Sequence, residues 1–212
     1  MSNDRTASTR GSLFVVSAPS GAGKTTLCRR IIDIFPNLRH SVSFTTRSMR
    51  PGEREGVDYF FVDPEVFAQM IAAGSFAEWA EVHGNRYGTA IDTLEQWRNC
   101  GHDVLLDIDI QGANQLRKSY GQSEAVFIFI LPPDLTELRR RLEGRGTDAP
   151  EVIERRISNA RGEIQASTDY DYIVINDDFE MALTQLKSII VAEGCRSSRV
   201  LPALATGFDI NI

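Results

Sequence analysis

Residues 18–25, near the start of this 212-residue chain, have the composition and spacing of a phosphate-binding loop. They read Ala-Pro-Ser-Gly-Ala-Gly-Lys-Thr. Small residues let the backbone approach a ligand closely, so that successive N–H groups can surround the oxygens of a polyphosphate. Lys24 can then reach the outer phosphates, and the hydroxyl of Thr25 can ligate Mg²⁺. The stretch therefore predicts a P-loop, a backbone cradle for the phosphates of a nucleoside triphosphate.

One position departs from the usual pattern G-x-x-x-x-G-K-[ST], because Ala18 stands where the first glycine is expected. A glycine-rich turn that binds no ligand is the alternative. The flanking residues favour the P-loop, since an apolar run at 13–16 suits a buried strand and a helical pattern begins at Thr25. We therefore predict that the triphosphate is bound by Ala18, Pro19, Ser20, Gly21, Ala22, Gly23, Lys24, Thr25 and Thr26.

Two arginines in the stretch 43–59 form a second candidate phosphate site. Arg47 and Arg50 lie three positions apart beside hydroxyl-bearing residues, and guanidinium groups bind phosphate with two parallel hydrogen bonds. Tyr59 and Tyr87 add phenol groups that can donate hydrogen bonds. A solvated loop with surface arginines is the alternative for this stretch.

A third cluster contains the arginines at 139–145, followed by Arg156. A basic helix face in contact with solvent is the reading we prefer for Arg139, Arg140 and Arg155. Gly144 and Gly146 break the helical pattern, so that this segment could change conformation.

The elements that must position these groups alternate between strands and helices, which predicts a parallel α/β core flanked by helices. Core strands are expected at 13–16, 104–109, 126–131 and 172–178, and helices at 25–35, 93–100, 112–120, 135–142, 150–166 and 180–193. Residues 41–90 are rich in short strands, at 41–47, 58–62, 76–80 and 85–87, with one helix at 63–74. This segment therefore looks like a small inserted lobe. The residues after Gly194 show no clear pattern.

Composition limits the classes of protein to consider. An apolar fraction of 42% and a charged fraction of 25% are those of an ordinary globular protein, and a net charge of −6 argues against non-specific binding to nucleic acid or to an anionic membrane. The apolar runs are too short to span a bilayer, and residues 1–10 lack the apolar core of a signal peptide. Cys28, Cys100 and Cys195 have neither metal-ligand nor disulfide spacing. We expect a cytoplasmic protein in which Cys28 is a buried apolar residue.

Seven stretches in one chain resemble the guanylate kinase family, a family of P-loop nucleoside monophosphate kinases that phosphorylate GMP. They are A-P-S-G-A-G-K-T at 18–25, S-V-S-F-T-T-R-S-M-R-P-G-E-x-x-G-x-D-Y at 41–59, E-W-A at 78–80, Y-G-T at 87–89, L-L-D-I-D-I-Q-G at 105–112, R-L-E-G-R-G-T at 141–147 and V-I-N-D-D at 174–178. The resemblance extends from about residue 13 to residue 193, which is far more specific than a P-loop alone.

The resemblance implies a role for each matched residue. The phosphate of GMP would be held by Arg47, Arg50, Tyr59 and Tyr87. Ser43 and Thr89 would contact guanine O6, while Glu78 and Asp109 would face the N1–H and the exocyclic amine. Guanine offers two donors and one acceptor along this edge, so carboxylates beside hydroxyls match it and mismatch adenine. Catalytic roles at the transferring phosphoryl group would fall to Lys24, Arg47, Arg141, Arg145 and Arg156.

The same resemblance places Asn176 near the adenine of ATP and divides the chain into parts. A leader at 1–12 and a tail at 196–212 would flank one domain at 13–195. Within it, the core would comprise 13–40, 91–131 and 167–195, the GMP-binding lobe about 41–90, and a helical lid about 132–166. Asp107, at the end of an apolar strand, could orient Mg²⁺ through a water molecule.

The implied reaction is ATP + GMP ⇌ ADP + GDP with Mg²⁺, and dGMP is an expected second acceptor. A non-catalytic phosphopeptide-binding module, of the kind found in scaffold proteins, is the alternative from another class, although such modules usually lack a working P-loop. A kinase for another nucleoside monophosphate is opposed by Ser43, Glu78, Thr89 and Asp109 as a set. No nucleic-acid or membrane partner is expected, and homo-oligomerisation is left open.

Overall fold

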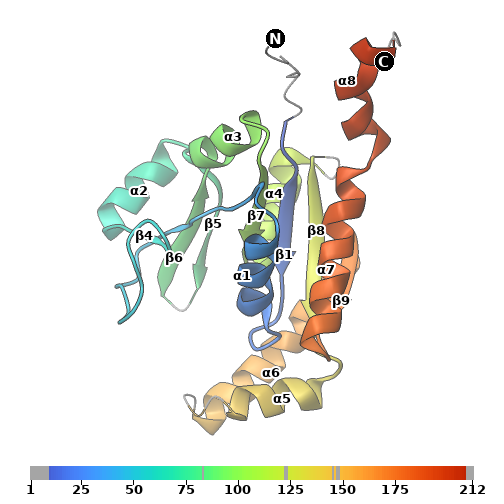
Figure 1. Ribbon diagram of the computed structural model, residues 1–212. Coiled ribbons are helices and arrows are strands. Elements are labelled where there is room, and N and C mark those ends of the chain that lie inside the picture. Colours follow the sequence, from blue (N-terminus) through green and yellow to red (C-terminus); the bar gives the residue numbers. More distant parts are fainter. Residues whose placement is uncertain (1–9, 83, 122–123, 145, 147–148, 209–212) are drawn as a thin grey trace.

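The protein is described by a computed structural model covering residues 10–208, apart from 83, 122–123, 145 and 147–148 (Figure 1). Its centre is a five-stranded parallel sheet in the order β2-β7-β1-β8-β9. The strands are β1 (Leu13–Ser17), β2 (Leu38–His40), β7 (Asp103–Asp107), β8 (Ala125–Leu131) and β9 (Tyr172–Ile175). This parallel core, flanked by helices, confirms the α/β fold class expected from the sequence.

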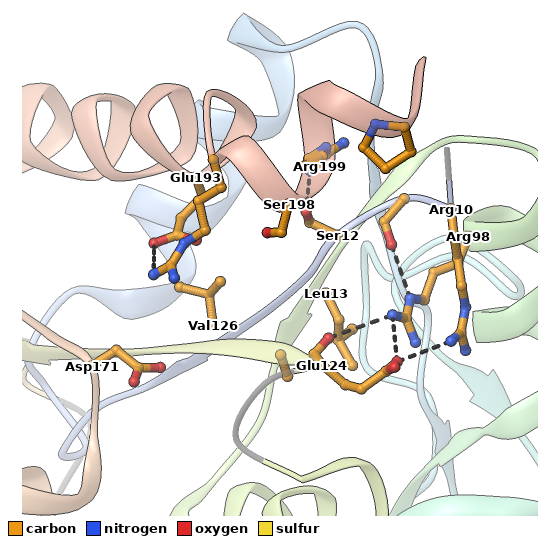
Figure 2. Close-up of a pocket in the computed structure, with 14 residues that line it drawn as sticks. Arg10, Ser12, Leu13, Arg98, Glu124, Val126, Asp171, Glu193, Ser198 and Arg199 are labelled. Atoms are coloured by element: carbon orange, nitrogen blue, oxygen red, sulfur yellow. Dashed lines mark hydrogen bonds and ion pairs between the residues drawn. The ribbon is translucent and has the colours of Figure 1, made fainter. Parts of the chain in front are cut away.

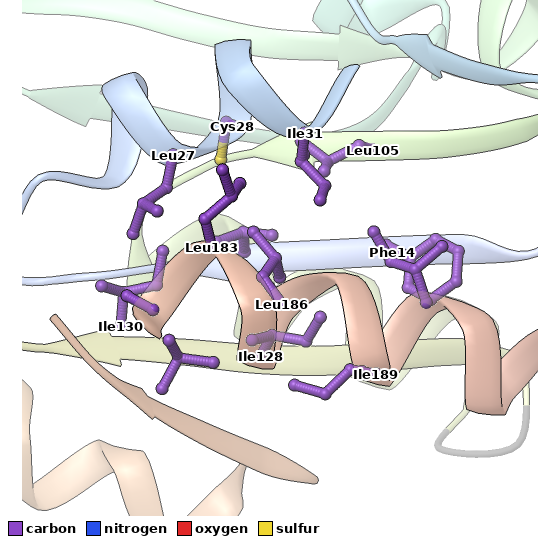
Figure 3. Packing of buried hydrophobic residues seen from close by; sticks show 14 of the residues in the cluster. Phe14, Leu27, Cys28, Ile31, Leu105, Ile128, Ile130, Leu183, Leu186 and Ile189 are labelled. Carbon is purple, nitrogen blue, oxygen red and sulfur yellow. The ribbon is translucent and has the colours of Figure 1, made fainter. Parts of the chain in front are cut away.

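One face of the sheet is covered by α1 (Lys24–Ile34) and α7 (Phe179–Gly194). Side chains from both helices interdigitate with those of β1 and β8, as Figure 3 shows for Leu27, Leu186 and Ile128. Cys28 belongs to this cluster and is 2% exposed, which confirms its predicted role as a buried apolar residue.

The opposite face is covered by α3 (Ile91–Asn99) and α4 (Ile110–Tyr120). Leu94 of α3 and Leu116 of α4 pack there against Val15 of β1 and Phe127 of β8. Because parallel strands are buried on both faces, near-continuous apolar runs such as that of β8 are the expected signature of this sheet.

A second, four-stranded sheet in the order β4-β3-β6-β5 forms a lobe beside the core (Figure 1). It comprises β3 (Phe44–Thr45), β4 (Phe60–Phe61), β5 (Phe76–Val82) and β6 (Asn85–Ala90), and it carries α2 (Pro64–Ala72). Phe67 of α2 stacks on Phe76 of β5 with ring centroids 4.5 Å apart, so the lobe has its own small apolar centre.

A pair of helices, α5 (Leu135–Gly144) and α6 (Pro150–Gln165), lies beyond the carboxyl ends of the core strands (Figure 1). A 3₁₀ turn, η1 (Ala166–Asp169), leads back into β9. The last helix, α8 (Ser197–Phe208), lies at the other end of the molecule, near the start of β1. Among the described residues, no helix combines the length and apolar character needed to cross a membrane.

Several elements differ from the sequence expectations. The strands expected at 41–47 and 58–62 shrink to two residues each, because β3 and β4 pair with one another over only two positions. The strand expected at 104–109 ends at Asp107, and Asp109 begins α4 instead. β2 was not predicted, since in Leu-Arg-His only Leu38 is buried. The residues after Gly194 showed no clear pattern, yet they form α8.

Candidate active site

The loop between β1 and α1 has the backbone conformation of a phosphate cradle. Gly21 and Gly23 have φ of 101° and 93°, the left-handed region that favours glycine. Gly23 is the N-cap residue of α1, so Lys24 and Thr25 lie in the first turn, where backbone N–H groups lack helical partners. The loop therefore presents free donors and the positive end of a helix dipole at one point.

Asn176, the residue directly after β9, supports the backbone of the P-loop. The side-chain nitrogen Nδ2 of Asn176 donates to the carbonyl of Ala22 at 2.7 Å, and Asn176 is 6% exposed. A side chain at Gly23 would clash with this amide. In this structure Asn176 thus supports the loop backbone, and its expected contact with adenine stays a prediction.

Lys24 extends from the loop towards the end of β7. Its ammonium lies 2.6 Å from Oδ1 of Asp107 and donates to the carbonyl of Ile108 at 2.7 Å. Burial opposes the charge on Lys24, but the adjacent carboxylate of Asp107 outweighs it, and the pKa of Lys24 is raised. The side chain therefore remains a cation close to the bound phosphates expected here.

A cavity of about 560 Å³ opens over the P-loop. The residues of the predicted triphosphate site that line it are Ala18, Pro19, Ser20, Gly21, Gly23, Lys24, Thr25 and Thr26. Arg156 and Glu163 of α6 line its far wall, with Val82 and Asp109 at the side nearest the lobe. Ala22 is buried beneath the loop and does not line the cavity.

A second cavity, of about 170 Å³, lies between the lobe and the core. Five of the residues expected to bind GMP line it: Ser43, Tyr59, Glu78, Tyr87 and Asp109. Val82 and Asp109 line both cavities, so the two spaces adjoin. Residues from β5, β6 and the start of α4 are thereby brought together although they lie far apart in the sequence.

Glu78 is the most perturbed carboxyl group of this pocket. It is 4% exposed, and burial raises its pKa to about 7, with the charge of Asp109 adding to the effect. The hydroxyl of Thr89 donates to Oε1 of Glu78 at 2.6 Å. In this arrangement the one proton of that hydroxyl points to Glu78. Of the two hydroxyls expected to contact guanine O6, Ser43 lines the pocket and Thr89 does not.

Asp109 is fixed as the N-cap residue of α4. Its Oδ1 accepts a hydrogen bond from the backbone N–H of Gly112 at 2.9 Å. The cap orients the carboxylate towards both cavities while satisfying one free donor of the helix end.

Arg47 lies next to the pocket and forms an ion pair with Glu53, an acidic residue to which the sequence analysis gave no role. Glu53 accepts two hydrogen bonds from the guanidinium of Arg47, at 3.0 and 2.8 Å, and one from the backbone N–H of Arg50 at 2.8 Å. The guanidinium lies over the ring of Tyr59 at 5.3 Å. Glu53 thus orients Arg47, whereas the side chain of Arg50 is exposed.

Of the two expected lid arginines that the structure describes, Arg156 lines the P-loop cavity, where its Nη1 lies 3.4 Å from Oγ of Ser20, and Arg141 does not. Arg141 donates to Glu137 at 2.6 Å and to the backbone carbonyl of Asn176 at 2.8 Å. Arg145 lies outside the described residues. Arg139 and Arg140 form surface ion pairs with Glu154 and Glu137, which agrees with the solvent-exposed helix face expected for them.

A larger cavity, of about 610 Å³, lies at the amino ends of β1 and β8, away from the P-loop (Figure 2). Arginines line it, but their charges are already paired: Glu124 binds both Arg10 and Arg98, at 2.9 and 3.2 Å. Arg199 of α8 bonds to Ser12 across the same space. The residues that line this cavity thus form a network of ion pairs and hydrogen bonds, which fastens residues 10–12 and α8 to the sheet.

The P-loop, the parallel sheet, the inserted lobe and the helical pair over the loop define a nucleoside monophosphate kinase. Comparison with known proteins identifies the family within this class. The family model described as guanylate kinase matches residues 10–193. The chain is 61% identical to a guanylate kinase of Geobacter sulfurreducens, with 95% of this chain and 98% of that protein covered.

Further relatives agree. The identity to a guanylate kinase of Syntrophotalea carbinolica is 59%, over 95% of each chain. A crystal structure of guanylate kinase from Anaplasma phagocytophilum superimposes with a TM-score of 0.76 at 34% identity, covering 96% of this chain and 98% of that one. The chain belongs to the guanylate kinase family, and it is an enzyme.

Proposed function

We propose a residue-level account of how this member of the guanylate kinase family transfers the γ-phosphoryl group of ATP to GMP. The observation that carries it is the adjacency of the two cavities, which share Val82 and Asp109. One has the donors of a polyphosphate site and the other has the buried carboxylates and hydroxyls of a guanine site. ATP in the first and GMP in the second would meet at their common boundary.

In the ATP site, backbone N–H groups of residues 18–26 would surround the phosphates. Lys24 would neutralise charge on the group in transfer, and Arg156 would act from α6 on the other side of the cavity. Transfer would be direct and in line, since positioning and charge neutralisation supply most of the catalysis of such reactions.

In the GMP site, the carboxylates of Glu78 and Asp109 would accept from N1–H and the exocyclic amine. Ser43 would donate to O6, and Thr89 would contact the same edge once its hydroxyl is released from Glu78. AMP would set its amine against the hydroxyl of Ser43 and leave a carboxylate without a donor. Unpaired polar groups of this kind can reject the wrong base by about 10⁴-fold or more.

The phosphate of GMP would be held by Arg47, Arg50, Tyr59 and Tyr87. Two observations support this: Tyr59 and Tyr87 line the pocket, and Arg47 lies over the ring of Tyr59. Glu53 would keep the guanidinium of Arg47 oriented until the phosphate arrives. Arg50, which is exposed, would have to turn inwards when GMP binds.

The residues near the phosphates also suit Mg²⁺, which prefers hard oxygen ligands. The hydroxyl of Thr25 and the carboxylate of Asp107 are oxygen donors at the mouth of the loop and at the end of β7, where Oδ1 of Asp107 pairs with Lys24. Thr25 would ligate the ion and Asp107 would hold it through water. The ion would supply neutralisation of phosphate charge.

Helices α5 and α6 would act as the lid and residues 41–90 as the GMP-binding lobe. Their closure would exclude water and so prevent hydrolysis of ATP. Arg141 and Arg145 would join Arg156 in the closed state, for which Arg141 must leave Glu137. Asn176 would reach adenine from its place under the loop. We further propose action in the cytoplasm and acceptance of dGMP, with homo-oligomerisation left open.

One assay tests the proposal: release of ADP from ATP with GMP, dGMP, AMP, CMP or UMP as acceptor. Turnover with GMP and dGMP alone is expected. Glu78→Gln and Asp109→Asn should raise the KM for GMP by about tenfold or more and leave the KM for ATP nearly unchanged. Equal losses for the two substrates would refute the guanine assignment, and binding of a phosphopeptide without turnover would favour the module alternative.

A further inference from the structure

The outer edge of β5 is completed by a side chain of the core. β5 is an edge strand of the four-stranded sheet, so some of its backbone groups have no partner strand. At Trp79 the side chain of Gln115, from α4, takes that place. The N–H of Trp79 donates to Oε1 of Gln115 at 3.1 Å, and Nε2 of Gln115 donates to the carbonyl of Trp79 at 2.6 Å.

The same face of α4 leaves room for the neighbouring side chain of β5. Gly112 and Gln115 lie three residues apart, which places them on one side of the helix. A Cβ atom on Gly112 would clash with Oε2 of Glu78 and lie 3.0 Å from its Cδ atom. The space that Glu78 occupies therefore exists only because residue 112 has no side chain.

Glu78 is consequently held between two fixed points. On one side Ala77, 7% exposed, packs into the apolar cluster that includes Ala113 and Leu116 of α4. On the other side the carboxamide of Gln115 fixes the peptide of Trp79 through both its donor and its acceptor. Trp79 as a whole residue is 36% exposed, and it belongs to none of the buried apolar clusters of the described residues.

We propose that Gln115 is a positioning residue for guanine recognition, which holds β5 against α4 so that the carboxylate of Glu78 lies over Gly112. The inference rests on the proposed assignment of Glu78 and Asp109 to guanine. Gly112 supports the same arrangement twice, since its N–H also holds Oδ1 of Asp109. The first turns of α4 thus position both of the carboxylates that would contact the base.

The physical consequence follows from the directionality of hydrogen bonds. Without Gln115, the peptide of Trp79 can rotate or slide, and Glu78 moves with it. Hydrogen bonds weaken steeply with distorted angles, so contacts to guanine would be lost before the fold is. The phosphate contacts of ATP, which lie on the P-loop, do not depend on this contact between β5 and α4.

The test is Gln115→Met, which keeps an unbranched side chain but removes both hydrogen bonds. We expect the KM for GMP to rise about tenfold and the preference for GMP over AMP to fall. The KM for ATP and the kcat at saturating GMP should stay within about threefold, because ATP site and chemistry are untouched. Asn114→Ala, an exposed amide on the same helix, is the control and should behave as wild type.

An unchanged KM for GMP in folded Gln115→Met, or an equal rise for ATP and GMP, would overturn the inference. If that variant does not fold, Gln115→Asn decides, because it keeps the carboxamide on a side chain one carbon shorter, which does not reach the peptide of Trp79. A GMP-selective rise in KM supports the inference, and an unchanged KM overturns it. Failure of wild type to phosphorylate GMP would instead refute the proposed function, so the two failures are distinguishable.

Discussion

At the scale of single residues, Lys24 is the group whose loss should separate the two substrates. Its ammonium lies between the P-loop and Asp107, and it does not line the GMP cavity. We expect Lys24→Met to lower kcat by about 10²–10³-fold, the usual effect of removing one charge-stabilising donor. GMP affinity, measured by calorimetry, should change by less than about twofold, since no contact to the acceptor is lost.

Lys187→Met is the matched control, because it removes the same charge from the exposed face of α7. It should leave kcat and both KM values unchanged. A folded Lys24 variant that loses GMP affinity as severely as turnover would contradict the separation of donor and acceptor sites.

Glu78 makes GMP binding depend on pH. Its pKa is raised to about 7, and the two N–H donors of guanine require the ionised carboxylate. Lowering the pH from 8 to 6 should therefore weaken GMP binding by about tenfold, because about nine-tenths of the groups are then protonated. The dissociation constant measured by calorimetry across this range is the direct test.

The phosphate of GMP also titrates near pH 6, and in the same direction. Glu78→Gln separates the two effects, since it keeps the shape of the side chain and removes its titration. The pH dependence should be shallower in this variant. Identical slopes in the two proteins would show that Glu78 does not titrate on binding.

The raised pKa has a consequence for stability as well. The folded state binds this proton more tightly than the unfolded chain, whose carboxyl titrates near 4.3. The contribution of Glu78 to stability is therefore fully present below that pH and is lost as the pH rises through about 7. Recognition of guanine and stability of the free protein thus make opposite demands on one buried carboxyl group.

At the scale of elements, the junction of the P-loop with β9 should control ATP binding. Asn176→Ala removes the donor to the carbonyl of Ala22, a hydrogen bond within a buried site. We expect a loss of about 1–2 kcal/mol in unfolding free energy and a several-fold higher KM for ATP, with the KM for GMP unchanged. Urea denaturation and steady-state kinetics measure the two effects.

A double substitution tests the contact itself. Gly23→Ala should almost abolish ATP binding, because its φ of 93° is unfavourable for alanine and its methyl group would clash with Asn176. In the Asn176→Ala background the clash disappears while the backbone strain remains. The second substitution should thus restore part of the affinity, and strict additivity would show that the two residues do not interact.

These contacts also show where sequence reasoning ends. The β1 strand, the P-loop and β8 could be predicted because a long apolar run and a local motif carry their signal. Strands were also expected around β3 and β4, but their length of only two residues could not be predicted, since it depends on the pairing of β3 with β4 and with β6. Asn176 and Ala22 are 154 positions apart, and no local pattern reports their contact.

Part of the candidate site could likewise be predicted from the sequence, and part of it could not. The resemblance to the guanylate kinase family assigned Ser43, Glu78 and Asp109 to guanine, and the structure brings these residues to one cavity. The spacing from Arg47 to Glu53 offered a weak signal for an ion pair that was passed over. Gln115 gave none, because its function depends on the edge of a strand from another part of the chain.

At the scale of the whole molecule, the two ends of the parallel sheet have different roles. The carboxyl ends of β1 and β7 lead to the P-loop and to Asp107, as expected for ligand sites in open α/β sheets. The amino ends meet a network in which Arg10, Arg98 and Arg199 fasten the start of β1 and the helix α8 (Figure 2). Substitutions at the two ends should therefore have separable effects.

Arg98 tests this division, because it is 3% exposed and its guanidinium donates to the carbonyl of Gly11 at 3.0 Å while pairing with Glu95 and Glu124. We expect Arg98→Met to lower the unfolding free energy by about 2–3 kcal/mol, since several hydrogen bonds to a charged group are lost in a buried setting. Arg10→Met removes a guanidinium that pairs with the same two carboxylates but is 42% exposed, so its cost should stay below about 1 kcal/mol. Below their melting temperatures both variants should retain the KM values and kcat of wild type, because the sheet separates this network from both substrate cavities. A fall in kcat/KM for Arg98→Met without a loss of stability would show instead that the amino-terminal end of the sheet is coupled to the active site.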